Sequence, residues 1–166
     1  MIPFYPENYG FPMENLYNGQ MNWISRSEED TIAHAQNFAH GLSAGDVVCL
    51  YGDLGMGKSV FARSLIRALT ANPQQEVPSP TFTLVQTYAS TQGEIWHFDL
   101  YRLKNPDEIY ELGWEEALGG AISLIEWPAH LGGLLPPDRI DIHFTLLSDG
   151  GRLLQVERRG AKKVLP

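Results

Sequence analysis

The stretch Gly52-Asp53-Leu54-Gly55-Met56-Gly57-Lys58-Ser59 fits the phosphate-binding loop pattern of glycine, four residues, and Gly-Lys-Ser/Thr. A loop of this kind points several backbone N–H groups at one place, where they bind phosphate oxygens. The lysine adds a positive charge, and the serine hydroxyl is a ligand for Mg²⁺. The stretch therefore predicts that the chain binds a nucleoside triphosphate together with Mg²⁺.

The segments on either side of the loop are those that the pattern requires. Residues 47–51 form a continuous apolar run, which is typical of a buried parallel strand. After the loop, apolar residues recur at helical spacing over 59–69. A helix that begins at the loop directs the positive end of its dipole toward the phosphate, so this context strengthens the prediction.

The rest of the chain alternates between helix and strand patterns. Ser25 to Glu28 has the residues of a capping box, which predicts a helix that begins there and ends near Gly41. Asn105 before Pro106 is a second cap signal. The predicted strands are 47–51, 81–88, 94–98, 121–125, 140–146 and 153–158, and the other predicted helices are 59–69, 105–112 and 114–118. Since the strand pairs at 81–98 and 140–158 read as hairpins, we expect an α/β, P-loop NTPase-like three-layer fold with a central, largely parallel sheet and added antiparallel strands.

Length and composition set the limits on domain organisation and partners. At 166 residues the chain is expected to form one domain over 23–160, with a flexible leader at 1–22 and a basic tail at 161–166. No apolar run approaches the ~20 residues of a membrane span, and the lone Cys49 favours a reducing compartment, the cytoplasm. The net charge of −8 disfavours direct, tight RNA binding, because free-standing nucleic-acid binders are usually basic.

Two carboxylates and a threonine are candidates for companions of the loop. Asp99 and Glu126 each follow an apolar strand, and acids at such strand ends emerge beside the phosphate loop. A nucleotide hydrolase needs a carboxylate near Mg²⁺ and a group that orders the attacking water. Thr81 follows a rigid Pro-Ser-Pro segment and is a candidate switch threonine or simply the first residue of a strand. His97 and Tyr101, on either side of Asp99, are interpreted as packing residues.

Five segments in this order resemble the TsaE (YjeE) family, the bacterial ATPase component of tRNA threonylcarbamoyladenosine synthesis. The resemblance runs from about Ser25 to Arg158. The Ser-Pro-Thr-Phe, Phe-Asp-Leu-Tyr-Arg and Ile-Glu-Trp-Pro segments are more specific than the phosphate loop, which many families share. The matching segments are residues 52–59, 78–85, 97–103, 111–116 and 124–128.

The resemblance implies a role for each matching residue. Lys58 would contact the β- and γ-phosphates, Thr81 would be the switch threonine, and Ser59 would bind Mg²⁺. Asp99 and Glu126 would be the acids near the metal, without an assignment of which binds it and which orders water. Trp127 would be the aromatic neighbour of the nucleotide, although a tryptophan after a buried strand is equally well a packing residue. The phosphates would be cradled by Gly52, Asp53, Leu54, Gly55, Met56 and Gly57.

The resemblance also implies a function, beside which two others remain open. The implied function is an ATPase that serves as an accessory subunit to TsaD and TsaB, so that tRNA is met only through that complex. A P-loop kinase acting on a small molecule or a protein would explain the loop and acids equally well. Such kinases usually have an arginine-rich lid, and the sequence between Leu103 and Ile140 contains a single arginine, Arg139. The other alternative is a nucleotide-gated binding module with negligible catalysis.

Overall fold

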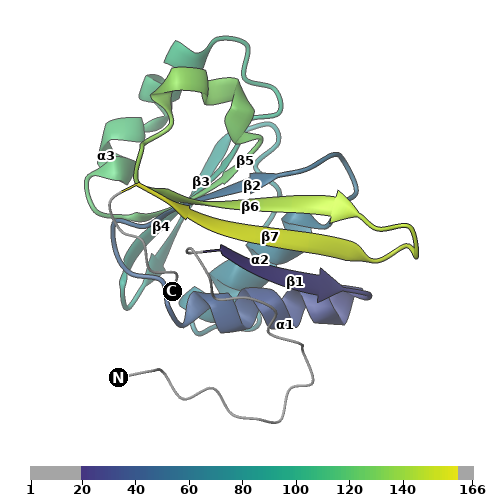
Figure 1. The fold of residues 1–166 in the computed structure, drawn as a ribbon. Coiled ribbons are helices and arrows are strands. Elements are labelled where there is room, and N and C mark those ends of the chain that lie inside the picture. The colour runs from purple at the N-terminus through teal and green to yellow at the C-terminus, as the bar shows by residue number, and fades with distance from the viewer. Residues whose placement is uncertain (1–19, 161–166) are drawn as a thin grey trace.

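A seven-stranded sheet forms the centre of the computed structural model, which describes residues 20–160 (Figure 1). The spatial order is β1-β7-β6-β2-β5-β4-β3. The four strands β6, β2, β5 and β4 run parallel, while β1, β7 and β3 are added antiparallel at the two sides. This arrangement confirms the predicted fold class. The strands are β1 (Gln20–Ser25), β2 (Val47–Tyr51), β3 (Val85–Ser90), β4 (Gly93–Asp99), β5 (Ile122–Glu126), β6 (Arg139–Leu146) and β7 (Arg152–Arg159).

Helices cover both faces of this sheet (Figure 1). On one face lie α1 (Glu28–Ala39) and α2 (Lys58–Leu69), whose buried residues share a core cluster with Val48 and Leu50 of β2. The opposite face is covered by shorter helices, which share a second cluster with Cys49. Because β2 is apolar on both faces, it lies in the middle of the sheet, as its sequence predicted. The shorter helices are the 3₁₀-helix η1 (Pro106–Leu112), α3 (Trp114–Leu118) and the 3₁₀-helix η2 (Pro128–Leu134).

The local signals fix most elements but misplace two boundaries. The first helix is capped by Ser27, whose hydroxyl accepts a hydrogen bond from the Asp30 N–H at 3.1 Å, so the capping box predicted at Ser25 was wrong by two residues. The third strand begins at Val85 instead of Thr81. The Leu84 N–H donates to the Pro80 carbonyl at 2.7 Å, and Leu84 has φ +67°, so residues 81–84 form a turn.

The strand β1 was missed because half of it falls in the predicted leader. Residues 20–25 pair in register with β7, from Gln20 opposite Glu157 to Ser25 opposite Arg152. Trp23 anchors the strand by packing edge-on against Phe38 of α1, with ring centroids 5.7 Å apart. The rest of the leader and the tail 161–166 lie outside the described residues. In the part of the chain that the structure describes, no helix has the length and apolar character needed to cross a membrane.

The imidazole of His34 connects α1 to β1 and predicts a pH dependence of stability. Its Nε2–H donates to the Ile24 carbonyl at 3.1 Å, and its ring stacks on Trp23. Burial lowers the pKa of His34 below its usual 6.5, against the opposing effects of the Ile24 carbonyl and Asp30. Below pH 6.5 the unfolded chain therefore takes up a proton here more readily than the folded protein, so acidification lowers the free energy of unfolding.

The variant His34→Gln, which keeps an amide donor near Ile24, isolates this effect. Its free energy of unfolding is expected to fall less than that of the wild type between about pH 7 and about pH 5. Urea titrations of both proteins at several pH values measure the two slopes. Equal slopes would show that His34 does not carry the acid sensitivity.

Candidate functional site

The phosphate loop joins β2 to α2 and requires glycine at three positions. Gly52, Gly55 and Gly57 have φ values of +147°, +78° and +99°, in the region that favours glycine. At Gly52 there is also no space, because a Cβ would lie 3.0 Å from both the Cβ and the carbonyl oxygen of Phe144. The three glycines thus allow the turn that brings the loop to the N-terminus of α2, and Gly57 is the N-cap of that helix.

The Lys58 ammonium lies against the inner side of this loop. Its Nζ donates to the Gly52 carbonyl and, at 2.8 Å, to the Asp53 carbonyl. It also lies 4.2 Å from the centroid of the Trp127 ring, a cation–π contact. The residue is only 5% exposed, and burial lowers the pKa of Lys58, while Glu126, Asp53 and Asp99 oppose that shift. A desolvated positive charge at the N-terminus of a helix is suited to bind an anion.

The two candidate carboxylates lie side by side at the carboxyl ends of neighbouring parallel strands. Asp99 ends β4, Glu126 ends β5, and the two are partners in the register of the sheet. Ser59 Oγ donates to Glu126 Oε2 at 3.2 Å, which connects the acid to the phosphate loop. Thr81 Oγ1 donates to Asp99 Oδ2 at 3.3 Å. The structure therefore brings together Ser59, Thr81 and both acids, four residues that the sequence singled out from four separate segments.

The remaining loop residues differ in what their side chains do. Leu54 is 67% exposed, so its contribution to a phosphate site is limited to its backbone. Met56 packs against the core cluster under α2, which directs it away from the inner side of the loop. Asp53 is exposed, and its carbonyl accepts from Lys58.

Sequence reasoning underestimated His97, which is bonded to Glu126. Its Nε2 lies 2.9 Å from Glu126 Oε1, and both side chains are only 3% exposed. The imidazole and the Ser59 hydroxyl thus hold the two oxygens of one carboxylate in place. The signal was present in the alternation of β4, since His97 and Asp99 are two residues apart and share a face of the strand. The sequence alone could not show that Glu126, on the neighbouring strand β5, is the partner of His97.

Trp127 has features of both interpretations that the sequence left open. It is partly buried and packs against the second core cluster. It also has a left-handed backbone, with φ 59° and ψ 47°. Its ring contacts the Lys58 ammonium, and it packs against the Tyr101 ring with the two ring centroids 4.9 Å apart. A strained backbone of this kind concentrates at functional sites. Trp127 is therefore a packing residue whose exposed part lies beside the phosphate loop.

The donor set fits Mg²⁺ with most of its ligands supplied by nucleotide and water. The side chains at hand are the hydroxyl of Ser59 and the carboxylates of Glu126 and Asp99, which are the oxygen ligands that Mg²⁺ prefers. Within residues 20–160 no group of three or more His, Cys, Asp or Glu side chains is arranged to hold a metal ion on its own. Magnesium at nucleotide sites usually binds through one or two carboxylates plus phosphates, and these side chains could supply such ligands.

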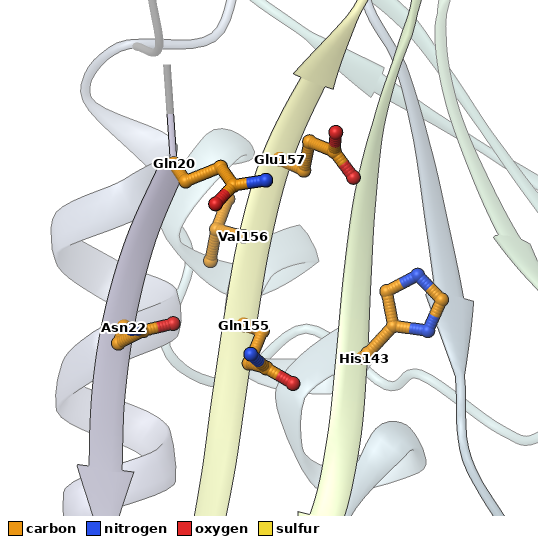
Figure 2. A pocket seen from close by; sticks show the side chains of 6 residues that line it. All are labelled: Gln20, Asn22, His143, Gln155, Val156 and Glu157. Carbon is orange, nitrogen blue, oxygen red and sulfur yellow. The ribbon is translucent and has the colours of Figure 1, made fainter. Parts of the chain in front are cut away.

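A polar pocket lies elsewhere on the sheet, along β1, β7 and β6 (Figure 2). Its lining includes no residue of the phosphate loop and none of the candidate site residues. The pocket therefore gives no reason to move the candidate site from the loop. The side chains that line it are Gln20, Asn22, His143, Gln155, Val156 and Glu157.

Known proteins resemble this chain over most of its length. The family model described as "Threonylcarbamoyl adenosine biosynthesis protein TsaE" matches residues 25–154. The chain belongs to the TsaE family. Among its curated relatives, the TsaE protein of Rickettsia bellii is 46% identical over 133 residues, which are 80% of this chain and 92% of that protein.

Two further comparisons span a wider range of bacteria. The TsaE protein of Aquifex aeolicus is 36% identical over 136 residues, which cover 82% of this chain and 95% of that protein. The crystal structure of Bacillus subtilis YdiB superposes with a TM-score of 0.69 and 27% identity, covering 88% of this chain and 90% of that one. The likeness to this solved structure extends over most of the fold of both chains.

Proposed function

We propose that this protein is a Mg²⁺-dependent ATP-binding and ATP-hydrolysing subunit that acts in the threonylcarbamoyl modification of adenosine in tRNA. The observation that carries the proposal is that Ser59, Asp99 and Glu126 lie together near Lys58, at the carboxyl ends of the parallel strands. The named role of the TsaE relatives supplies the biological process. The protein would act in the cytoplasm, with TsaD-like and TsaB-like partners, and would meet tRNA through them.

The residues divide the work of binding between the loop and the strand ends. The loop N–H groups and Lys58 would hold the phosphates, as a loop and helix N-terminus of this form do elsewhere. Ser59, together with Glu126, would hold Mg²⁺, which would neutralise charge that develops on the transferring phosphoryl group. Trp127 would line the side of the site next to Lys58, because its ring already lies 4.2 Å from the ammonium.

The hydrogen bonds favour different tasks for the two acids. Glu126 is bonded to the hydroxyl that would bind Mg²⁺, which supports a role for Glu126 as the metal ligand. Asp99 accepts from the hydroxyls of Thr81 and Ser79, at 3.3 and 3.4 Å, and from the Tyr101 N–H. A carboxylate surrounded by hydroxyl groups is suited to order a water molecule near the γ-phosphate. We therefore assign the metal to Glu126 and the attacking water to Asp99 and Thr81.

Exposed apolar side chains near the site support a subunit that works with partners. Leu54, in the loop, and Phe82, next to Thr81, are 67% and 81% exposed. The Arg102 guanidinium packs 4.4 Å from the Phe82 ring centroid. Such side chains lose contact with water when a partner binds, and their closeness to the proposed nucleotide site would make partner binding depend on the nucleotide.

Nucleotide binding and turnover can be tested separately. Titration with ATP and Mg²⁺ is expected to change the tryptophan fluorescence, because ATP would draw Lys58 away from Trp127, and Trp127→Phe should remove the change. With TsaD, TsaB, tRNA and threonylcarbamoyl-adenylate present, ATP should sustain formation of the modified nucleoside over many turnovers. Equal sustained yield with a non-hydrolysable analogue would favour the binding module, and transfer of labelled phosphate to an acceptor would favour the kinase.

A further inference from the structure

The C-terminal hairpin forms the outer wall of the phosphate loop. Phe144 of β6 lies against Gly52, where a Cβ would come 3.0 Å from the Phe144 Cβ and carbonyl oxygen. Arg152, the first residue of β7, contacts the loop at Gly55, its hydrogen-bond partner 97 positions away in the sequence, and passes near Gly57. The hairpin therefore contacts the loop at two places, and the two contacts come from different strands.

The Arg152 side chain is directed at the segment that begins α2. Its Nη2 donates to the Gly55 carbonyl at 3.3 Å. Its Cδ and Nε lie 3.9 and 4.0 Å from the point where a Cβ at Gly57 would be, so it passes close to the N-cap of the helix. The Nε atom is buried and has no hydrogen-bond partner among the described residues. Part of the guanidinium charge is thus desolvated beside the loop.

The positive charge of Arg152 lies near the positive end of the α2 dipole, and this unfavourable placement calls for an explanation. A cation at a helix N-terminus is unfavourable, because that end already carries positive partial charge. The first turn of α2 reads Lys-Ser-Val-Phe and has no acid to compensate. Lys58 adds a second cation to the same loop. An anion bound by the loop would attract both cations and the helix N-terminus, so the closeness of these positive charges would become favourable.

The two cations also divide the carbonyl groups of the loop between them. Lys58 occupies the carbonyls of Gly52 and Asp53, and Arg152 occupies that of Gly55. A loop that binds phosphate must turn its N–H groups inward and its carbonyls away from the anion. The Gly55 carbonyl is bonded to Arg152, which keeps its peptide plane in that orientation, whereas the Gly52 and Asp53 carbonyls face Lys58 on the inner side of the loop. Lys58 is expected to leave the carbonyls for phosphate when a nucleotide binds, whereas Arg152 contacts the loop from the hairpin and can stay.

We propose that Arg152 is a positioning residue for the nucleotide site: it holds the Gly55–Gly57 segment in its phosphate-binding conformation and adds positive charge from the outer side of the loop. The inference rests on the proposed nucleotide binding. It gives the β6–β7 hairpin a part in that binding, and it predicts that ATP affinity depends on a residue outside the phosphate-loop motif.

The variants Arg152→Ala, Arg152→Gln and Arg152→Lys test the proposal, with Arg159→Ala as the matched control. Arg159 lies on the same strand but pairs with Asp141 and Glu157. Calorimetric titration with ATP and Mg²⁺ is expected to give a Kd about 10-fold higher for the alanine variant, which corresponds to the loss of one charge-assisted hydrogen bond. Lysine should restore part of the affinity, glutamine less, and the control should bind as the wild type does.

Hydrogen exchange of the backbone amides at 53–58, measured without nucleotide, separates this proposal from the proposed function. Arg152→Ala should exchange several-fold faster there, while exchange in β2 and β5 stays unchanged. Unaltered exchange and unaltered Kd in Arg152→Ala would overturn the positioning role, as would equal Kd values for the lysine and alanine variants. If the wild type itself does not bind ATP, the proposed function fails, and the exchange rates alone decide whether Arg152 holds the loop.

Discussion

Replacing Lys58 with methionine is expected to weaken ATP binding by about 100-fold or more while leaving the fold intact. Hydrogen bonds to charged groups contribute about 1.5–3 kcal/mol each, and Lys58 would make at least two of them with phosphate oxygens. Methionine keeps the length of the apolar stem next to Trp127. Calorimetric titration with ATP and Mg²⁺ measures the binding, and formation of the modified nucleoside with the partner proteins measures the consequence.

The stability of the same variant gives an internal control. Burial lowers the pKa of Lys58, so the folded protein disfavours the charge that the unfolded chain carries freely. Lys58→Met is therefore expected to unfold at a temperature equal to or higher than that of the wild type. As the pH rises toward the ordinary lysine pKa of about 10.4, the free energy of unfolding of the wild type should rise relative to that of the variant. The reason is that the unfolded wild type then binds more protons than the folded form.

Two results would count against this role of Lys58. If the variant sustains modification over many turnovers at the wild-type yield, the loop does not carry the function. If it loses ATP binding but also unfolds at a much lower temperature, the lysine has a structural role instead. A loss of binding with retained stability is the pattern typical of functional residues, which are seldom chosen for stability.

Sequence reasoning found the parts of the site that lie in local patterns. The phosphate loop, the apolar strand 47–51 and the acids at strand ends are each visible within about ten residues, because strand and helix periodicity is a local property. The parallel register that places Asp99 beside Glu126 follows from the same rule, since carboxyl ends of parallel strands meet at one edge.

The parts that were missed depend on contacts between distant segments. Arg152 reads as one of several basic residues near the C-terminus, and only the folded sheet places it at Gly55. His97 reads as a packing residue until β5 brings Glu126 to it. The strand β1 lacked a signal of its own, because it lies at the edge of the sheet and is held by Trp23 packing on α1. For Arg152 and His97 the deciding partner is far away in the sequence, and the strand that β1 pairs with, β7, lies at the other end of the described chain.

Replacing Glu126 with glutamine is expected to reduce ATP hydrolysis about 100-fold and to raise the Mg²⁺ concentration required for half-maximal activity, as removing one charged group from a metal and phosphate site does. The amide keeps the shape of the side chain beside Ser59 and His97 but lacks the negative charge. ATP binding without Mg²⁺ should become slightly tighter, because one anion next to the phosphates is removed. Phosphate release at a series of Mg²⁺ concentrations measures both effects.

The comparison with Asp99→Asn makes the assignment of the two acids falsifiable. If Asp99 orders the attacking water with Thr81, its amide variant should lower the maximal rate at an unchanged Mg²⁺ requirement. The reverse pattern would exchange the two roles. Glu94→Gln is the matched control, since Glu94 is exposed on β4 and bonded to Trp96. A shift in Mg²⁺ requirement that is seen only in Glu126→Gln would mean that the metal binds beside the Ser59–Glu126 hydrogen bond. This one contact between loop and sheet would then couple phosphate binding to the carboxylates.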